Sequence, residues 1–131
     1  MSKVPGCSDS VLLALWRKVV RAEWGGKCAL VSPLGDCEGS IECHHIKRRN
    51  IPHLKYSPSN GVCLCQYHHS KAKYRTWRAM IENAVGLVKM EWLDAQERCL
   101  FPDYLAWQEM TRAEWRRYQK GYLQKLLGEM T

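Results

Sequence analysis

Four of the five histidines of this chain form two adjacent pairs, His44–His45 and His68–His69. The first pair lies in the stretch ECHHIKRRN and the second in NGVCLCQYHHSK. Side chains alternate between the two faces of a strand, so two adjacent histidines in an extended segment point in opposite directions. One histidine can then bind a metal ion while its neighbour handles a proton, because a neutral imidazole with a pKa of about 6.5 can do either.

Cysteines surround the histidine pairs. The chain has seven cysteines, an odd number, and in a reducing compartment this pattern favours metal ligation over a disulfide framework. The two-residue gap between Cys65 and His68 lets a tight turn present two ligands to one Zn²⁺. Cys28 and Cys37 can complete a structural site with four ligands. The alternative is a set of buried, inert thiols beside a hydrogen-bonded histidine.

The elements that must position these residues are short in the middle of the chain and helical at its ends. Apolar residues at helical spacing predict a helix over 11–23, capped by Ser8, Asp9 or Ser10. Turn signals and X-Pro bonds fill residues 27–67, where we expect strands at about 41–46 and 61–64. Helical patterns then return over 68–83, part of 87–98 and 103–127.

We expect a single domain over 1–131. Its parts are an N-terminal helix (1–26), a compact core (27–83) and a C-terminal helical extension (84–131). The turn-rich core buries little apolar surface, so a bound metal would supply folding free energy.

The order and spacing of the candidate residues resemble those of the HNH endonucleases, which share a ββα-metal fold. In that family a histidine dyad ends the first strand, an asparagine pins the following loop, and a last histidine begins the helix. His44–His45, Asn60 and His69 have this order, and the interval of nine residues from Asn60 to His69 also matches. The segment NGVCLCQYHH resembles the zinc-stapled branch, N-x-x-x-L-C-x-x-C-H, with His68 in place of the second cysteine. The resemblance covers about residues 27–80.

The resemblance implies an α+β protein with a ββα-metal core and a structural zinc site, flanked by an N-terminal helix and C-terminal helices. It assigns a catalytic divalent ion to His44 and His69, and the role of general base to His45, which would activate water for hydrolysis of a DNA phosphodiester. Asn60 would fix the loop that orients His45. Mg²⁺ is the expected ion, with Mn²⁺ or another divalent ion as the alternative. Lys73 stands where some members carry a further ligand.

A formal net charge of +7 makes DNA the expected partner. Two basic clusters flank the histidine pairs, and we expect them to contact phosphates. They are Lys47, Arg48 and Arg49, then Lys71, Lys73 and Arg75. Two other functions stay open: a zinc-stapled module that binds DNA or protein without catalysis, and a nuclease selective for branched DNA. Nicking and double-strand cleavage are not distinguished.

The remaining predictions concern the cellular location of the protein and the residues outside the candidate site. No apolar run approaches the roughly 20 residues that span a bilayer, so we expect a cytoplasmic protein, by analogy in a phage-infected bacterial cell. The aromatic residues of the last helix predict core packing or an interface with a second copy or a partner protein. His53 is expected in a solvent-exposed loop. Cys43 and Cys63 are expected to pack between strands, although either could replace Cys37 as a zinc ligand.

Overall fold

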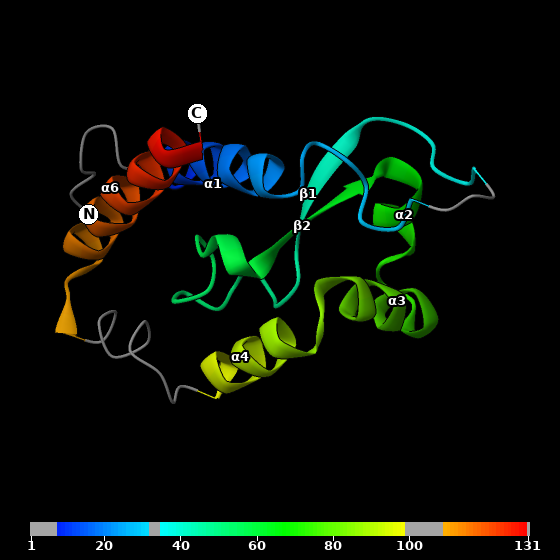
Figure 1. The fold of residues 1–131 in the computed structure, drawn as a ribbon. Coiled ribbons are helices and arrows are strands. Elements are labelled where there is room, and N and C mark those ends of the chain that lie inside the picture. Colours follow the sequence, from blue (N-terminus) through cyan, green and yellow to red (C-terminus); the bar gives the residue numbers. More distant parts are fainter. Residues whose placement is uncertain (1–7, 32–34, 99–108, 131) are drawn as a thin grey trace.

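A two-stranded antiparallel sheet lies among the helices of the chain (Figure 1). Strand β1 (Ile41–His45) pairs with β2 (Gly61–Cys65), and the register places His45 opposite Gly61. The protein is therefore α+β, as predicted, and both strands lie within one residue of their predicted bounds.

The structure is a computed structural model that describes residues 8–31, 35–98 and 109–130. The predicted start of the last helix at residue 103 lies outside these ranges, and the described helix there is α6 (Arg112–Met130). Among the described helices, none combines the length and the apolar character that crossing a membrane requires.

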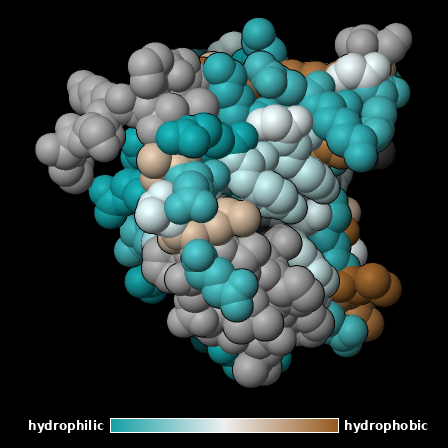
Figure 2. Space-filling model, turned by 90° about the vertical axis from the view of Figure 1, so that its left-hand side faces the viewer, coloured by the Kyte–Doolittle hydropathy of each residue, from teal (hydrophilic) through white to brown (hydrophobic). Residues whose placement is uncertain are grey.

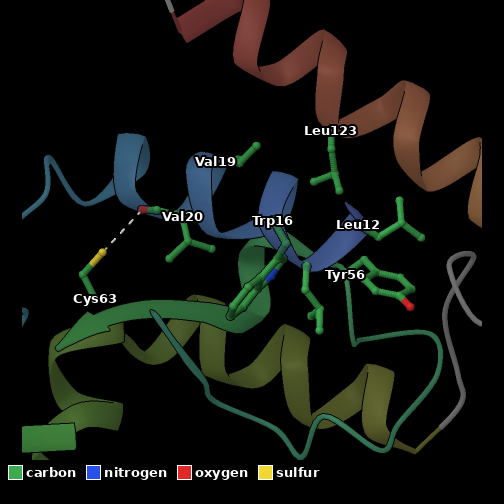
Figure 3. Close-up of a cluster of buried hydrophobic side chains, with 8 residues drawn as sticks. Leu12, Trp16, Val19, Val20, Tyr56, Cys63 and Leu123 are labelled. Carbon is green, nitrogen blue, oxygen red and sulfur yellow. Dashed lines mark hydrogen bonds between the residues drawn. The ribbon is translucent and has the colours of Figure 1, made fainter. Parts of the chain in front are cut away.

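Helix α1 (Asp9–Glu23) begins slightly before its predicted start at residue 11, because Ser8, one of the three predicted caps, accepts a hydrogen bond from the Val11 N–H. One side of α1 packs on α6 and another on the sheet. Figure 3 shows the buried cluster at this junction. Its labelled side chains are Leu12, Trp16, Val19, Val20, Tyr56, Cys63 and Leu123. The N-terminal helix is thus part of the same core as the strands.

The helical region after β2 is broken, so the prediction of one helix over 68–83 is wrong. Helix α2 (Gln66–Lys71) ends in turns, and α3 begins again at Arg75 and runs to Val85. The break lets the chain change direction, so that Ile81 of α3 can pack in a buried cluster with Val62 and Leu64 of β2. Tertiary packing here overrides a helical pattern that is continuous in the sequence.

Helix α4 (Leu87–Glu97) covers the loop between the two strands. Leu54 of that loop is fully buried against Met90 and Leu93. His53 is buried with it, and its Nε2 lies 2.7 Å from the Gln96 carbonyl oxygen, which can only accept a hydrogen bond. The prediction that His53 is solvent-exposed is therefore wrong, because a helix distant in sequence packs over it.

The surface of α6 carries a row of aromatic rings. Trp115 is buried, whereas Tyr118 and Tyr122 are exposed, and the three rings stack in succession. On the face shown in Figure 2, the coloured residues are mostly hydrophilic, and the most strongly hydrophobic ones lie mainly toward its right-hand side. A partner for this helix stays a prediction.

The start of α1 is tied to the interstrand loop by Asp9. Its carboxylate accepts hydrogen bonds from the Tyr56 hydroxyl at 2.5 Å and the Lys55 ammonium at 2.7 Å. Burial raises the pKa of Asp9, but these two bonds outweigh it and hold the pKa below the ordinary 3.8. The ionised carboxylate therefore stabilises the contact between α1 and the loop.

Replacing Gly61 with Ala should destabilise the fold. A Cβ at this position would collide with Val20 and lie 2.8 Å from Cζ2 of Trp16. This overpacking of the core should lower the free energy of unfolding by about 1–3 kcal/mol. The matched control is Gly121→Ala in α6, where a Cβ meets open space and better helix propensity should add up to about 1 kcal/mol. Chemical denaturation of both variants measures the two changes, and equal stability would contradict the packing described here.

Asp9→Asn should lower stability at neutral pH and not in strong acid. Because the folded-state pKa is depressed, the contribution of Asp9 is full above its unfolded pKa and disappears as the pH falls through the folded one. The side chain is 38% exposed, so screening limits the effect to about 1 kcal/mol or less. Thermal unfolding of both proteins at several pH values measures it. A difference that grows toward low pH would contradict the assignment.

Candidate functional site

Cys28, Cys37, Cys65 and His68 come together as the sequence predicts. Their ligand atoms all lie within 4.8 Å of one another. The Nδ1 of His68 is 3.2 Å from the sulfur of Cys65, 3.3 Å from that of Cys28 and 3.6 Å from that of Cys37. Three thiolates and one imidazole are a donor set that suits tetrahedral Zn²⁺. These four residues can therefore hold a metal ion.

Local structure positions these ligands. Cys65 ends β2 and caps α2, where its sulfur accepts a hydrogen bond from the His68 N–H at 3.4 Å. Burial raises the pKa of Cys65, but hydrogen bonds that include the one from His68 lower it to about 7. A thiol with this pKa is readily available as the thiolate that a metal requires. Cys28 is positioned by its neighbour. The Ala29 N–H donates a hydrogen bond to the Cys63 carbonyl of β2, which brings Cys28 beside this strand.

Asp36 supports the cluster from outside. Its Oδ2 lies 3.2 Å from the Nε2 of His68, on the side of the ring that faces away from the thiols. A carboxylate behind a ligating histidine favours the tautomer with its lone pair on the metal side, here on Nδ1. Asp36 was not predicted as a site residue, and the only signal for it in the sequence is its place next to Cys37.

Cys43 and Cys63 lie outside this cluster. They face each other across the two strands, and their sulfurs lie 3.5 Å and 3.8 Å from the carbonyl oxygens of Arg17 and Val20 in α1. The contact of Cys63 with Val20 is drawn in Figure 3. The structure therefore selects Cys37 over Cys43 or Cys63 as the remaining cysteine of the metal cluster.

The first histidine pair is divided between the two faces of β1. His45 faces α1, where its ring stacks on Trp16 with centroids 3.9 Å apart and planes at 7°. Its Nε2 lies 2.9 Å from the Lys55 carbonyl oxygen, which can only accept a hydrogen bond. Neutral His45 must therefore carry its proton on Nε2 and its lone pair on Nδ1. Burial lowers the pKa of His45, and the charges of Arg49, Lys55 and Arg17 lower it further.

His44 faces the opposite side, toward α2. Its ring meets that of His69 edge to face, with centroids 5.2 Å apart and an angle of 69°. The Nδ1–H of His69 donates to the Glu42 carboxylate at 2.8 Å, which leaves the lone pair of His69 on Nε2. Burial lowers the pKa of His44 to about 4, with additional effects from His69 and His45. The ring of His44 can thus offer a neutral nitrogen at neutral pH.

Glu42 was not predicted as a site residue. Its signal was present, because a residue two positions before His44 on a strand lies on the same face. In the parts of the chain that the structure describes, only the cysteine-rich cluster brings three or more potential ligand atoms within 4.8 Å. His44, His69 and Glu42 do not form such a group: two imidazoles meet, and the carboxylate of Glu42 bonds only His69.

Asn60 holds the loop that follows β1. It is fully buried at the end of a short turn, η1 (Pro58–Asn60). Its Oδ1 accepts from the Lys47 N–H at 2.6 Å, and its Nδ2 donates to the carbonyls of Lys47 and Leu54 at 3.1 Å and 3.2 Å. One side chain therefore fixes the backbone at two distant points of the loop.

The candidate phosphate contacts differ in their surroundings. The Lys47 ammonium binds Asp94 at 2.5 Å and Glu97 at 3.1 Å, so it already has anionic partners on α4. Lys71 lies against the rings of Tyr67 and Tyr74. The other four candidates are exposed. They are Arg48, Arg49, Lys73 and Arg75. Their contacts with DNA stay predictions.

Comparison with known proteins gave no matching family model, no match among curated proteins and no match among solved structures.

Cys65→Ala should abolish zinc binding, whereas Cys63→Ala should preserve it. The two residues lie on the same strand and both are buried, but only Cys65 belongs to the metal cluster. We expect one Zn²⁺ per chain in the wild type and in Cys63→Ala, and a large loss in Cys65→Ala. Metal analysis of the purified proteins measures this. Equal zinc content in the two variants would contradict the cluster.

Proposed function

We propose that the protein is a metal-dependent endonuclease of the HNH type that hydrolyses DNA phosphodiester bonds. The observation that carries the proposal is the division of the adjacent histidines: His45 has a fixed ring with its lone pair on Nδ1, while His44 meets His69 on the other side of the strand. A base and a metal-binding pair are the two components that metal-assisted phosphodiester hydrolysis needs.

His45 would act as the general base. Its Nδ1 would take a proton from water, and the resulting hydroxide would attack phosphorus in line with the 3′-oxygen. The P–O3′ bond would break, and the leaving oxygen would take a proton from solvent water. The Lys55 carbonyl, which accepts the Nε2–H at 2.9 Å, would hold the ring during this transfer and stabilise the imidazolium that forms. The lowered pKa of His45 keeps the ring in its basic form at neutral pH.

His44 and His69 would hold the divalent ion. Their donor set fits an ion that keeps most of its shell for water and phosphate oxygens, and Glu42 orients His69 for this role. When bound, Mg²⁺ or Mn²⁺ would offset the negative charge that grows on the phosphate and on the leaving oxygen. The metal cluster of Cys28, Cys37, Cys65 and His68 would have a structural role, because four protein ligands leave no open position.

Two observations support a polyanionic substrate. The chain has a net charge of +7, and the exposed Arg48 and Arg49 closely follow His44–His45 in the sequence. A zinc-stapled binding module would explain the metal cluster equally well. It would not require a half-buried, neutral His45 with a fixed tautomer next to the contact between His44 and His69, and this difference favours the nuclease.

His45→Ala should abolish cleavage and leave the fold intact. Supercoiled plasmid is incubated with wild type, His45→Ala and Cys43→Ala, each with Mg²⁺, with Mn²⁺ and with EDTA, and the topoisomers are separated on a gel. We expect metal-dependent nicked or linear product from wild type, and a rate lower by about 100- to 10,000-fold for His45→Ala. Cys43→Ala is the matched control, since Cys43 lies on the same strand and takes no part in the chemistry.

Equal cleavage by wild type and His45→Ala would show that His45 is not the base. No cleavage by any protein, with DNA binding retained in a shift assay, would favour the binding module. Cleavage confined to branched substrates would keep the mechanism and narrow the substrate.

A further inference from the structure

The N-terminal helix contacts His45 directly, although it lies outside the segment that resembles an HNH core. The indole of Trp16 is stacked on the imidazole of His45, with centroids 3.9 Å apart and planes within 7° of parallel. Trp16 is only 1% exposed and points from α1 into the buried cluster (Figure 3). The stack is therefore a contact of the core.

Two carbonyls of one loop fix the two rings. The Trp16 Nε1–H donates to the Ser57 carbonyl at 2.7 Å, and the His45 Nε2–H donates to the Lys55 carbonyl at 2.9 Å. The rings thus have their edges bound to backbone groups two residues apart and their faces against each other. A rotation of His45 would break its hydrogen bond or move the ring into the indole.

The opposite strand leaves room for this arrangement. Gly61 pairs with His45 in the sheet, and a Cβ there would lie 2.8 Å from Cζ2 of Trp16 and overlap Val20. The backbone of Gly61 is extended, so the absence of a side chain serves close packing rather than an unusual conformation. The indole therefore fills the space beside the residue that faces His45.

We propose that Trp16 is a positioning residue for His45, which makes α1 part of the catalytic apparatus. This inference rests on the proposed nuclease function. The indole face restricts the imidazole to one plane, so Nδ1 is directed at one position, where the attacking water must lie. Displacement of a reacting group by about 1 Å can cost about 100-fold in rate, so the loss of this restraint should lower kcat.

Three variants separate positioning from stability: Trp16→Leu, Trp16→Phe and Trp24→Leu. Trp24 is the matched control, because its indole N–H also binds a core carbonyl, that of Gly61 at 3.1 Å, and it packs in the same core. Kinetics on a defined DNA duplex give kcat and KM, unfolding curves give stability, and NMR gives the shifts of the His45 ring protons, which a stacked indole moves upfield.

We expect Trp16→Leu to lower kcat by about 10- to 100-fold with little change in KM, and to remove the upfield shift. Trp16→Phe, which keeps a flat ring, should recover most of kcat. Trp24→Leu should lose stability but keep kcat and the shift. Equal kcat for Trp16→Leu and Trp24→Leu would overturn the positioning role alone. The same conclusion would follow if the His45 ring protons of the wild type showed no upfield shift. A wild type that cleaves no DNA substrate with any metal would instead overturn the proposed function, and this role with it.

Discussion

The arrangement of the histidine site depends on the buried amide of Asn60. Its three hydrogen bonds go to backbone groups of Lys47 and Leu54, at two distant points of a loop that has little regular structure of its own. A net contribution of about 1 kcal/mol is typical of one such bond, but a buried partner left unpaired costs about 1–3 kcal/mol. The loop is therefore held in one conformation, in which the Lys55 and Ser57 carbonyls face His45 and Trp16.

The metal cluster and the histidine site are connected through α2. Cys65 caps this short helix and His68 lies inside it, so a metal bound to the cluster would fix the helix at its first turn. The residue after His68 is His69, whose ring meets His44 of β1. A helix of six residues has little stability alone. A structural ion would therefore hold His69 as well as the fold.

The spacing of neighbouring residues in the sequence predicted those parts of the site that lie on a single strand or turn. The division of His44 and His45 follows from strand alternation, and the short gap from Cys65 to His68 predicted their shared cluster. Contacts between distant elements were not predictable in this way. The break after α2 and the burial of His53 depend on packing by α3 and α4, and the stack of Trp16 on His45 depends on where α1 docks. No local pattern encodes these positions.

We propose that the two sites hold different metals and have different tasks, and that only the histidine site meets the phosphodiester. A crystal structure of the His45→Ala variant with a short DNA duplex and Mn²⁺, with manganese located by its anomalous scattering, tests this most directly. We expect Mn²⁺ bound to His44, His69 and a phosphate oxygen, and Zn²⁺ alone among the four cluster residues. Manganese at neither histidine, or DNA bound on a face away from β1, would contradict it.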